Sequence, residues 1–247
     1  MSRAKPLPRL YLPGDMPAHG VCVVPAEQSH HLAHVLRLAA GDAVIAFDGR
    51  GQEYPATIER IGKSGVTLSV GDPRAVDRES PLDVTLAQGL SSGDRMDYTV
   101  QKAVELGVRA IQPLASERSV VRLDRDRAAK RVAHWQAVVV AACEQCGRNR
   151  VPQVLPVAAL DAWLATVPAD AVRLTLTPGA SVRLIALERP RGALILLAGP
   201  EGGLSAREHE SAVMMGFTPV RLGPRVLRTE TAAVAALAAM QTLWGDF

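Results

Sequence analysis

The segment ALILLAGPEGGLSARE, residues 193–208, has the pattern of a buried strand, a glycine-rich turn and the start of a helix. The unbroken apolar run over 193–198 suits a strand that is covered on both faces of a parallel sheet. Ser205 and Glu208 have the spacing of a capping box, which leaves free backbone N–H groups at the helix N-terminus. Ligands of open α/β sheets bind beyond the carboxyl ends of the strands, so this turn is a candidate binding loop.

A second loop of the same kind follows the next expected strand. Residues 222–231, LGPRVLRTET, hold Arg225, Arg228 and Glu230 among mainly apolar neighbours and lead into an alanine-rich helix over 232–244. Such a helix can pack closely under a ligand loop or against a partner chain, and an ordinary core helix explains it equally well. A core helix does not explain the charged side chains of the loop, so this loop is a second candidate site.

Around these loops, the chain divides at a polar segment with proline over 73–81, which we interpret as a linker. Residues 82–247 alternate strands and helices, and this predicts an α/β domain with a mostly parallel sheet. Residues 1–72 place short strands around one helix, expected over 27–38, and predict a small β-barrel. The expected strands lie at 21–24, 43–47, 53–61 and 66–70 in the small domain, and at 82–88, 108–114, 172–176, 193–198 and 219–222 in the large one.

Composition narrows the class of protein. The 247 residues are 48% hydrophobic and 21% charged, which is typical of globular domains and excludes disordered and fibrous classes. The net charge is +3, and only four of the 28 basic residues are lysines. Arginine suits phosphate and base recognition, although a GC-rich coding bias explains its excess at least as well. Three cysteines, no signal-like start and no long apolar run predict a cytoplasmic protein without a membrane span.

Several chemistries lack their motifs. The sequence contains no GxxxxGK[ST], GxSxG or HExxH pattern, and no GxGxxG follows the first strand of the large domain. The small domain's helix carries His30, His31 and His34, and a lone CxxC is formed by Cys143 and Cys146. Neither group has the further ligands that a zinc site needs, so we expect no metal and leave the role of both groups open.

The two loops occur with further motifs in a fixed order. These are HLAHVLR at 31–37, QKAVELGV at 101–108, ERS at 117–119 and EQCGRN at 144–149. Together they resemble the 16S rRNA uracil-N3 methyltransferases, the RsmE family of the SPOUT superfamily. The resemblance implies a PUA-like RNA-binding β-barrel over 1–72, and a SPOUT α/β methyltransferase domain over 82–247 with a deep trefoil knot. It also implies a homodimer.

The same resemblance implies an activity and its alternatives. The expected reaction is transfer of a methyl group from S-adenosylmethionine, without a metal, to N3 of one uridine in 16S rRNA, within the assembled small ribosomal subunit. One alternative is a SPOUT methyltransferase that acts on another RNA, such as tRNA. Another is an RNA-binding ribosome assembly factor that has no catalytic turnover. The sequence leaves open whether naked rRNA or the subunit is the substrate.

The resemblance also assigns residues. Arg228 is expected to stabilise the charge that builds on the uracil ring, and Glu201 or Glu230 is expected to act as proton acceptor or ribose ligand. The alternative is that Arg228 and Glu230 have a structural role and only stabilise the knot. Residue 92 is a departure, because Ser92 stands where the family pattern has lysine. The residues expected to bind S-adenosylmethionine are Leu176, Thr177, Gly199, Pro200, Glu201, Gly202, Leu222, Gly223, Val226, Leu227 and Thr229, and those expected to bind RNA are Arg9, Arg37, Arg118 and Arg148.

Overall fold

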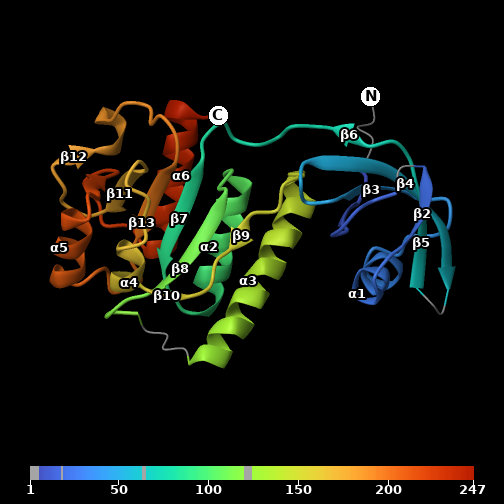
Figure 1. Ribbon diagram of the computed structural model, residues 1–247, viewed down its shortest axis with the longest axis horizontal. Helices are drawn as coiled ribbons and strands as arrows, with labels where there is room; N and C mark the ends of the chain where they lie inside the picture. The colour runs from blue at the N-terminus through green and yellow to red at the C-terminus, as the bar shows by residue number, and fades with distance from the viewer. Residues whose placement is uncertain (1–5, 18, 63–64, 120–123) are drawn as a thin grey trace. The chain divides into compact units, whose positions relative to one another are not determined.

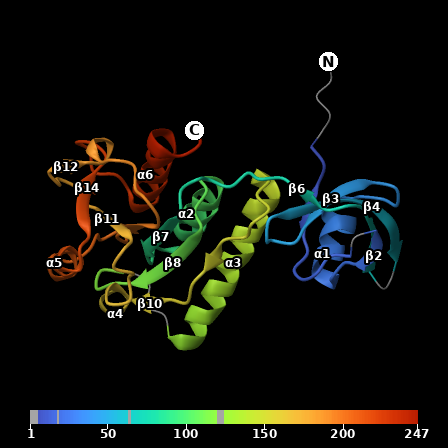
Figure 2. The same ribbon diagram turned by 45° about the horizontal axis from the view of Figure 1, so that its top comes forward.

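The computed structural model describes residues 6–17, 19–62, 65–119 and 124–247, and the chain forms two compact units (Figures 1 and 2). The first unit contains residues 1–79 together with residues 143–151. The second contains residues 80–142 and 152–247. The segment 143–151 belongs to the first unit although it lies far along the chain, beyond the expected linker.

The first unit is built on a six-stranded sheet with the order β1-β3-β4-β5-β2, in which β6 also pairs with β4. All pairings are antiparallel except that of β1 with β3. Alternating residues such as Val44, Ile58 and Leu68 point inward and form an apolar core with Leu32 of the helical segment. The strands are β1 (Arg9–Tyr11), β2 (Gly20–Val23), β3 (Ala43–Phe47), β4 (Gln52–Gly62), β5 (Gly65–Val70) and β6 (Arg74–Ala75).

The helical segment of this unit is shorter than the sequence predicts. It consists of α1 (Ala26–His30) and a π-helical turn, η1 (His31–Val35), and does not continue to residue 38. Arg37 has a left-handed backbone with φ 54°, a conformation that ends a right-handed helix. The N–H of Leu38 then donates to the carbonyl of Leu32 at 3.1 Å, which satisfies one of the last helical carbonyls.

The second unit is built on an eight-stranded sheet with the order β10-β8-β7-β13-β11-β14-β12, and β9 also pairs with β8. Every described pairing in it is parallel, which confirms the predicted mostly parallel α/β sheet. The strands are β7 (Val84–Gly89), β8 (Ala110–Ala115), β9 (Gln153–Val154), β10 (Ala158–Ala159), β11 (Val172–Leu176), β12 (Val182–Arg183), β13 (Leu194–Ala198) and β14 (Thr218–Arg221).

Helices cover both faces of this sheet (Figure 1). On one face, Ile195 and Leu197 of β13 pack in a cluster with residues of α4 and α5, whereas α2 packs beside α6. Side chains alternate along a strand, so Leu194 and Leu196 of β13 face the other side, and both are fully buried. The helices of this unit are α2 (Gly93–Glu105), α4 (Leu160–Leu164), α5 (Ala206–Met214) and α6 (Thr229–Trp244), with the short 3-10 turn η2 (Leu184–Ala186), while α3 (Arg125–Cys146) ends in the first unit.

Within the described ranges, no helix combines the length and the apolar character that a membrane crossing requires.

Candidate functional site

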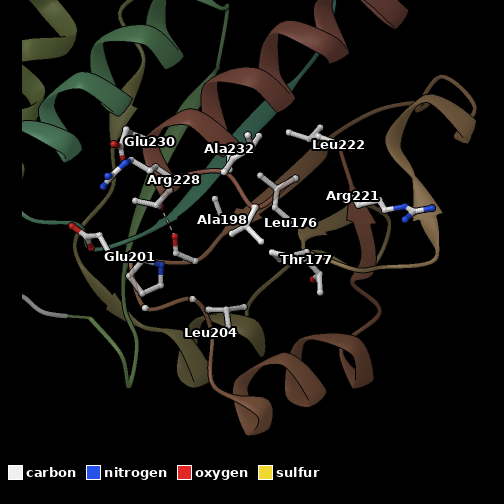
Figure 3. A pocket seen from close by; sticks show the side chains of 18 of the residues that line it. Leu176, Thr177, Ala198, Glu201, Leu204, Arg221, Leu222, Arg228, Glu230 and Ala232 are labelled. Atoms are coloured by element: carbon white, nitrogen blue, oxygen red, sulfur yellow. Dashed lines mark hydrogen bonds between the residues drawn. The ribbon is translucent and has the colours of Figure 1, made fainter. Parts of the chain in front are cut away.

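A cavity of about 430 Å³ opens at the carboxyl ends of β11, β13 and β14, where the loops after these strands meet the start of α6 (Figure 3). This is the edge at which parallel α/β sheets bind ligands, and the volume lies within the range of small-molecule pockets. All the residues expected to bind S-adenosylmethionine line this cavity, as do Arg228 and Glu230. Three segments that are distant in the sequence therefore form a single pocket.

The loop after β13 packs closely against the end of β7. A Cβ atom added at Gly89 would lie 2.5 Å from the backbone nitrogen of Pro200, so only glycine permits this approach. At the end of the loop, the predicted capping box is confirmed: Glu208 N–H donates to Ser205 Oγ at 3.2 Å, and Ser205 N–H donates to Glu208 Oε2 at 2.9 Å. The start of α5 is thereby fixed, together with the loop that precedes it.

A buried polar contact joins the two loops that the sequence predicts as binding sites. Thr229 Oγ1 donates to the carbonyl of Gly199 at 2.6 Å and accepts from Gln88 Nε2 at 3.1 Å. Gln88 is fully buried at the carboxyl end of β7. Sequence reasoning missed it, although an amide at the end of an otherwise apolar strand is a signal of this kind of contact.

Acidic side chains lie at one end of the pocket. Figure 3 shows Glu201, Arg228 and Glu230 at that end, away from Thr177 and Arg221. Glu201 Oε1 accepts hydrogen bonds from the N–H and Oγ of Ser92, both at 2.9 Å, and from Arg95 Nη1 at 3.3 Å. Burial raises the pKa of Glu201, but the bonds from Ser92 and Arg95 outweigh it, and the net shift is downward. Glu201 is therefore held as a carboxylate.

Arg95 connects this carboxylate to the second one. Its Nε lies 4.0 Å from Glu230 Oε1, so the guanidinium of Arg95 forms ion pairs with both glutamates. The second carboxylate oxygens, Glu201 Oε2 and Glu230 Oε2, are buried and have no hydrogen-bond partner in the described part of the chain. Sequence reasoning did not identify Arg95, because its partners lie more than 100 residues away.

The opposite end of the pocket contains a threonine–histidine pair. Thr177 Oγ1 and His209 Nε2 lie 3.1 Å apart, and both residues line the cavity. His209 comes from α5, directly after the capping box, and it too was missed from the sequence. Apolar side chains occupy the space between the two ends, among them Leu176, Ala198 and Leu222.

The four arginines expected to bind RNA have different surroundings. Arg37 is exposed on the first unit. Arg118 is also exposed, and its Nη1 donates to the carbonyls of Gly202 and Leu204 at 3.3 and 3.5 Å, beside the pocket. Arg9 and Arg148 are instead buried inside the first unit.

Arg9 and Arg148 belong to an ion-pair network that attaches residues 143–151 to the sheet of the first unit. Arg9 Nη1 donates to Glu53 Oε2 at 2.9 Å, and the guanidinium also contacts Asn149 and lies 4.9 Å from the centre of the Phe47 ring. Arg148 Nε donates to Glu79 Oε2 at 3.0 Å. Burial raises the pKa of Glu53, but the hydrogen bonds from Arg9, Arg78 and Asn149 lower it further, so the carboxylate stays charged.

The histidine and cysteine groups form no metal centre among the residues that the structure describes. The rings of His30 and His34 contact each other, with centroids 4.7 Å apart. Cys143 is buried, and burial raises the pKa of its thiol to about 12, so it stays protonated at neutral pH.

Comparison with known proteins gives consistent matches over nearly the whole chain. Residues 78–241 match the family described as an RNA methyltransferase domain, and residues 24–71 match the RNA methyltransferase PUA domain. Ribosomal RNA small subunit methyltransferase E of Bacillus subtilis is 33% identical over 88% of this chain and 88% of its own length. The protein of the same name from Buchnera aphidicola of Acyrthosiphon pisum is 30% identical over 98% of this chain and 96% of its own.

Solved structures extend this similarity to the fold. The ribosomal RNA small subunit methyltransferase E of Neisseria gonorrhoeae, bound to S-adenosyl methionine, has a TM-score of 0.92 and 44% identity, and the match covers 98% of this chain and 99% of that one. A Legionella pneumophila protein in complex with SAM has a TM-score of 0.95 and 37% identity, with 98% of this chain and 100% of that chain covered.

Proposed function

The chain belongs to the ribosomal RNA small subunit methyltransferase E family, and from this membership we propose that it transfers a methyl group from S-adenosylmethionine to N3 of one uridine in 16S rRNA. The observation that carries the proposal is the single pocket formed by the loops after β11, β13 and β14. Two structures with the same fold, at 44% and 37% identity, are described with the same methyl donor.

The residues of the pocket fit this donor. S-adenosylmethionine combines a flat aromatic purine, whose faces suit apolar contacts, with hydroxyl and ammonium hydrogen-bond donors and a positive sulfonium. Leu176, Ala198 and Leu222 supply apolar surface, and backbone groups of the loop after β13 are within the pocket. The buried, unpartnered oxygen of Glu201 supplies an acceptor with negative charge. When bound, the donor supplies an activated methyl group, so the reaction needs no metal.

The protein's own residues then have to align the uracil and manage its charge. N3 of uracil is a weak imide acid, and negative charge develops on the ring as its proton leaves. Arg228 lines the pocket, and no hydrogen bond or ion pair engages its guanidinium among the described residues. We assign Arg228 to stabilisation of that charge, because a cation fixed beside developing charge lowers the barrier directly.

RNA recognition is proposed to involve Arg9, Arg37, Arg118 and Arg148. Exposure supports direct contact by Arg37 and by Arg118, which lies beside the pocket. Arg9 and Arg148 already pair with Glu53 and Glu79, so their contribution is through the shape of the surface that the first unit presents. Recognition of RNA by shape and a few placed groups suits the small net charge of +3.

We also propose the finer features that the family resemblance implies. These are a trefoil knot around the pocket loops, a homodimer, a cytoplasmic location, and the assembled small ribosomal subunit as substrate. Light scattering at several protein concentrations tests the dimer. A comparison of methyl incorporation into naked 16S rRNA and into intact subunits tests the preferred substrate.

Two measurements test the proposed activity. Calorimetry with S-adenosylmethionine is expected to give micromolar or tighter binding, and absence of binding would leave only an RNA-binding role. Incubation with labelled donor and a mixture of small subunits, large subunits and tRNA, all from cells that lack the gene, is expected to label 16S rRNA alone. Labelling of tRNA instead would assign the chain to another RNA.

A further inference from the structure

Three side chains that line the pocket have a carboxylate oxygen or an imidazole nitrogen that could take up a proton: Glu201, Glu230 and His209. The reaction proposed above has to move one proton from N3 of the uracil. The existing contacts of each side chain indicate which of the three receives this proton.

His209 lies at the end of the pocket that is away from Arg228. Its Nε2 is 3.1 Å from Thr177 Oγ1, and Figure 3 places Thr177 at the opposite end from Arg228. A proton acceptor has to lie within hydrogen-bond reach of the atom that loses the proton, beside the group that stabilises the resulting charge. If Arg228 stabilises that charge, His209 does not meet this requirement.

One carboxylate oxygen of Glu201 already accepts several hydrogen bonds. Three donors bind its Oε1, two from Ser92 and one from Arg95. Hydrogen bonds to a carboxylate favour its charged form and make it a weaker base. Its remaining oxygen, Oε2, is buried and faces no protein donor among the described residues, which suits an anchoring contact to a bound ligand.

Glu230 is held more loosely. It lies in the first turn of α6, two residues after Arg228, and its one described ionic contact is to Arg95 Nε at 4.0 Å. Its side chain is 18% exposed, and Oε2 is buried without a partner. The charged groups that line the pocket around it are Arg95 from α2, Glu201 from the loop after β13, and Arg228 from its own loop.

We infer that Glu230 accepts the N3 proton of the target uracil, and that Arg95 is the positioning residue that holds Glu230 and Glu201 beside each other at this end of the pocket. The inference rests on the proposed function. The N3–H bond breaks and its proton passes to Glu230 Oε2, while N3 forms the new bond to the methyl carbon. The electron pair of the broken carbon–sulfur bond stays on sulfur, which becomes a neutral thioether. Glu201 keeps its charge throughout.

Single-turnover methyl transfer as a function of pH tests the assignment of Glu230. We expect Glu230→Gln to react at least about 100-fold more slowly at neutral pH. Above neutral pH, the rate of Glu230→Gln should rise close to tenfold per pH unit, because without the carboxylate the uracil has to lose its proton to solvent before it reacts. Calorimetry should show that Glu230→Gln binds S-adenosylmethionine within about threefold of the wild type. Glu210→Gln, on the exposed face of α5, is the matched control and should retain the wild-type rate.

Glu201→Gln separates the two carboxylates. It should weaken donor binding, and its methyl transfer should keep the wild-type dependence on pH. The inference is overturned if Glu230→Gln keeps the wild-type rate and pH profile, or if the steep pH dependence arises in Glu201→Gln instead. If the wild type makes no 3-methyluridine, the proposed function itself fails, which is a distinct result.

Two variants test Arg95. In Arg95→Ala the glutamates lose their shared cation, so we expect slower transfer at saturating donor and RNA, with a pH profile displaced to higher pH. Arg95→Lys retains a positive charge and should restore most of the rate. An Arg95→Ala variant that is less stable but has an unchanged pH profile would reduce Arg95 to a structural role and overturn this part of the inference.

Discussion

Gln88 and Thr229 share a buried side-chain hydrogen bond of 3.1 Å across 141 residues of sequence. Through the same hydroxyl, Thr229 also reaches the carbonyl of Gly199. The hydroxyl of Thr229 thus joins the end of β7 to two segments that line the pocket, the loop after β13 and the start of α6.

Thr229→Val is therefore expected to destabilise the second unit. The replacement has nearly the same shape but removes the hydrogen bonds of Thr229 Oγ1 to Gln88 Nε2 and to the Gly199 carbonyl, which keep a bond of 3.3 Å to each other. Loss of a hydrogen bond costs about 0.5–1.5 kcal/mol. Chemical unfolding measures this loss, and calorimetry should show weaker donor binding. Thr231→Val, two residues along the same helix and exposed, is the control. Equal stability of the two variants would contradict the role of this contact.

Glu53→Gln should destabilise the first unit at neutral pH by about 3 kcal/mol, because it leaves the buried Arg9 guanidinium without its counter-charge. The pKa of Glu53 is lowered in the folded protein, so its contribution to stability is present above the ordinary carboxyl pKa. It is lost as the pH falls through the folded value. Unfolding by denaturant at neutral and acidic pH measures the difference between variant and wild type.

That difference should shrink at acidic pH. The conservative control is Glu59→Gln, which changes an exposed residue of the same strand. A Glu53→Gln effect that does not depend on pH would show that packing, not charge, is responsible.

Cys143 should resist alkylation in the folded protein. Burial raises its pKa to about 12, and the thiolate is the reactive form of cysteine. Peptide mapping after iodoacetamide treatment should find Cys143 modified only after denaturation. Rapid modification of Cys143 under native conditions would mean that the end of α3 opens readily.

Arg228→Ala should lower the turnover rate by about 100-fold, in the range found when a group that stabilises transition-state charge is removed. Donor affinity should persist, because the loops that form the pocket remain in place. Steady-state kinetics and calorimetry together check this. Unchanged turnover would remove Arg228 from the mechanism and leave it as a brace for the loop.

Local sequence patterns predicted much of this fold and not all of it. The strands at 43–47 and 172–176 and the capping box at Ser205 are confirmed as predicted, because alternation, apolar runs and capping are short-range features. The three-residue strand β1 was missed, since it is too short to show a pattern and forms only by pairing with β3.

The same limit applies to the site. Both loops that the sequence predicts as binding sites line the pocket, and they were recognisable because glycine, proline and charged residues concentrate there. Gln88, Arg95 and His209 were not found, because each acquires its role from a partner in another segment. A local sequence pattern does not show which residues from distant segments contact each other.

The identity of the methylated nucleoside is the most direct test of the proposed transfer of a methyl group to N3 of uridine. The wild-type protein is incubated with S-adenosylmethionine and small ribosomal subunits from cells that lack the gene, and the 16S rRNA is digested to nucleosides for mass spectrometry. We expect new 3-methyluridine from one position, and at least about 100-fold less of it at early times when Glu230→Gln replaces the wild type at neutral pH. A methyl group on ribose, on another base or on another ring position of uracil would contradict this proposal.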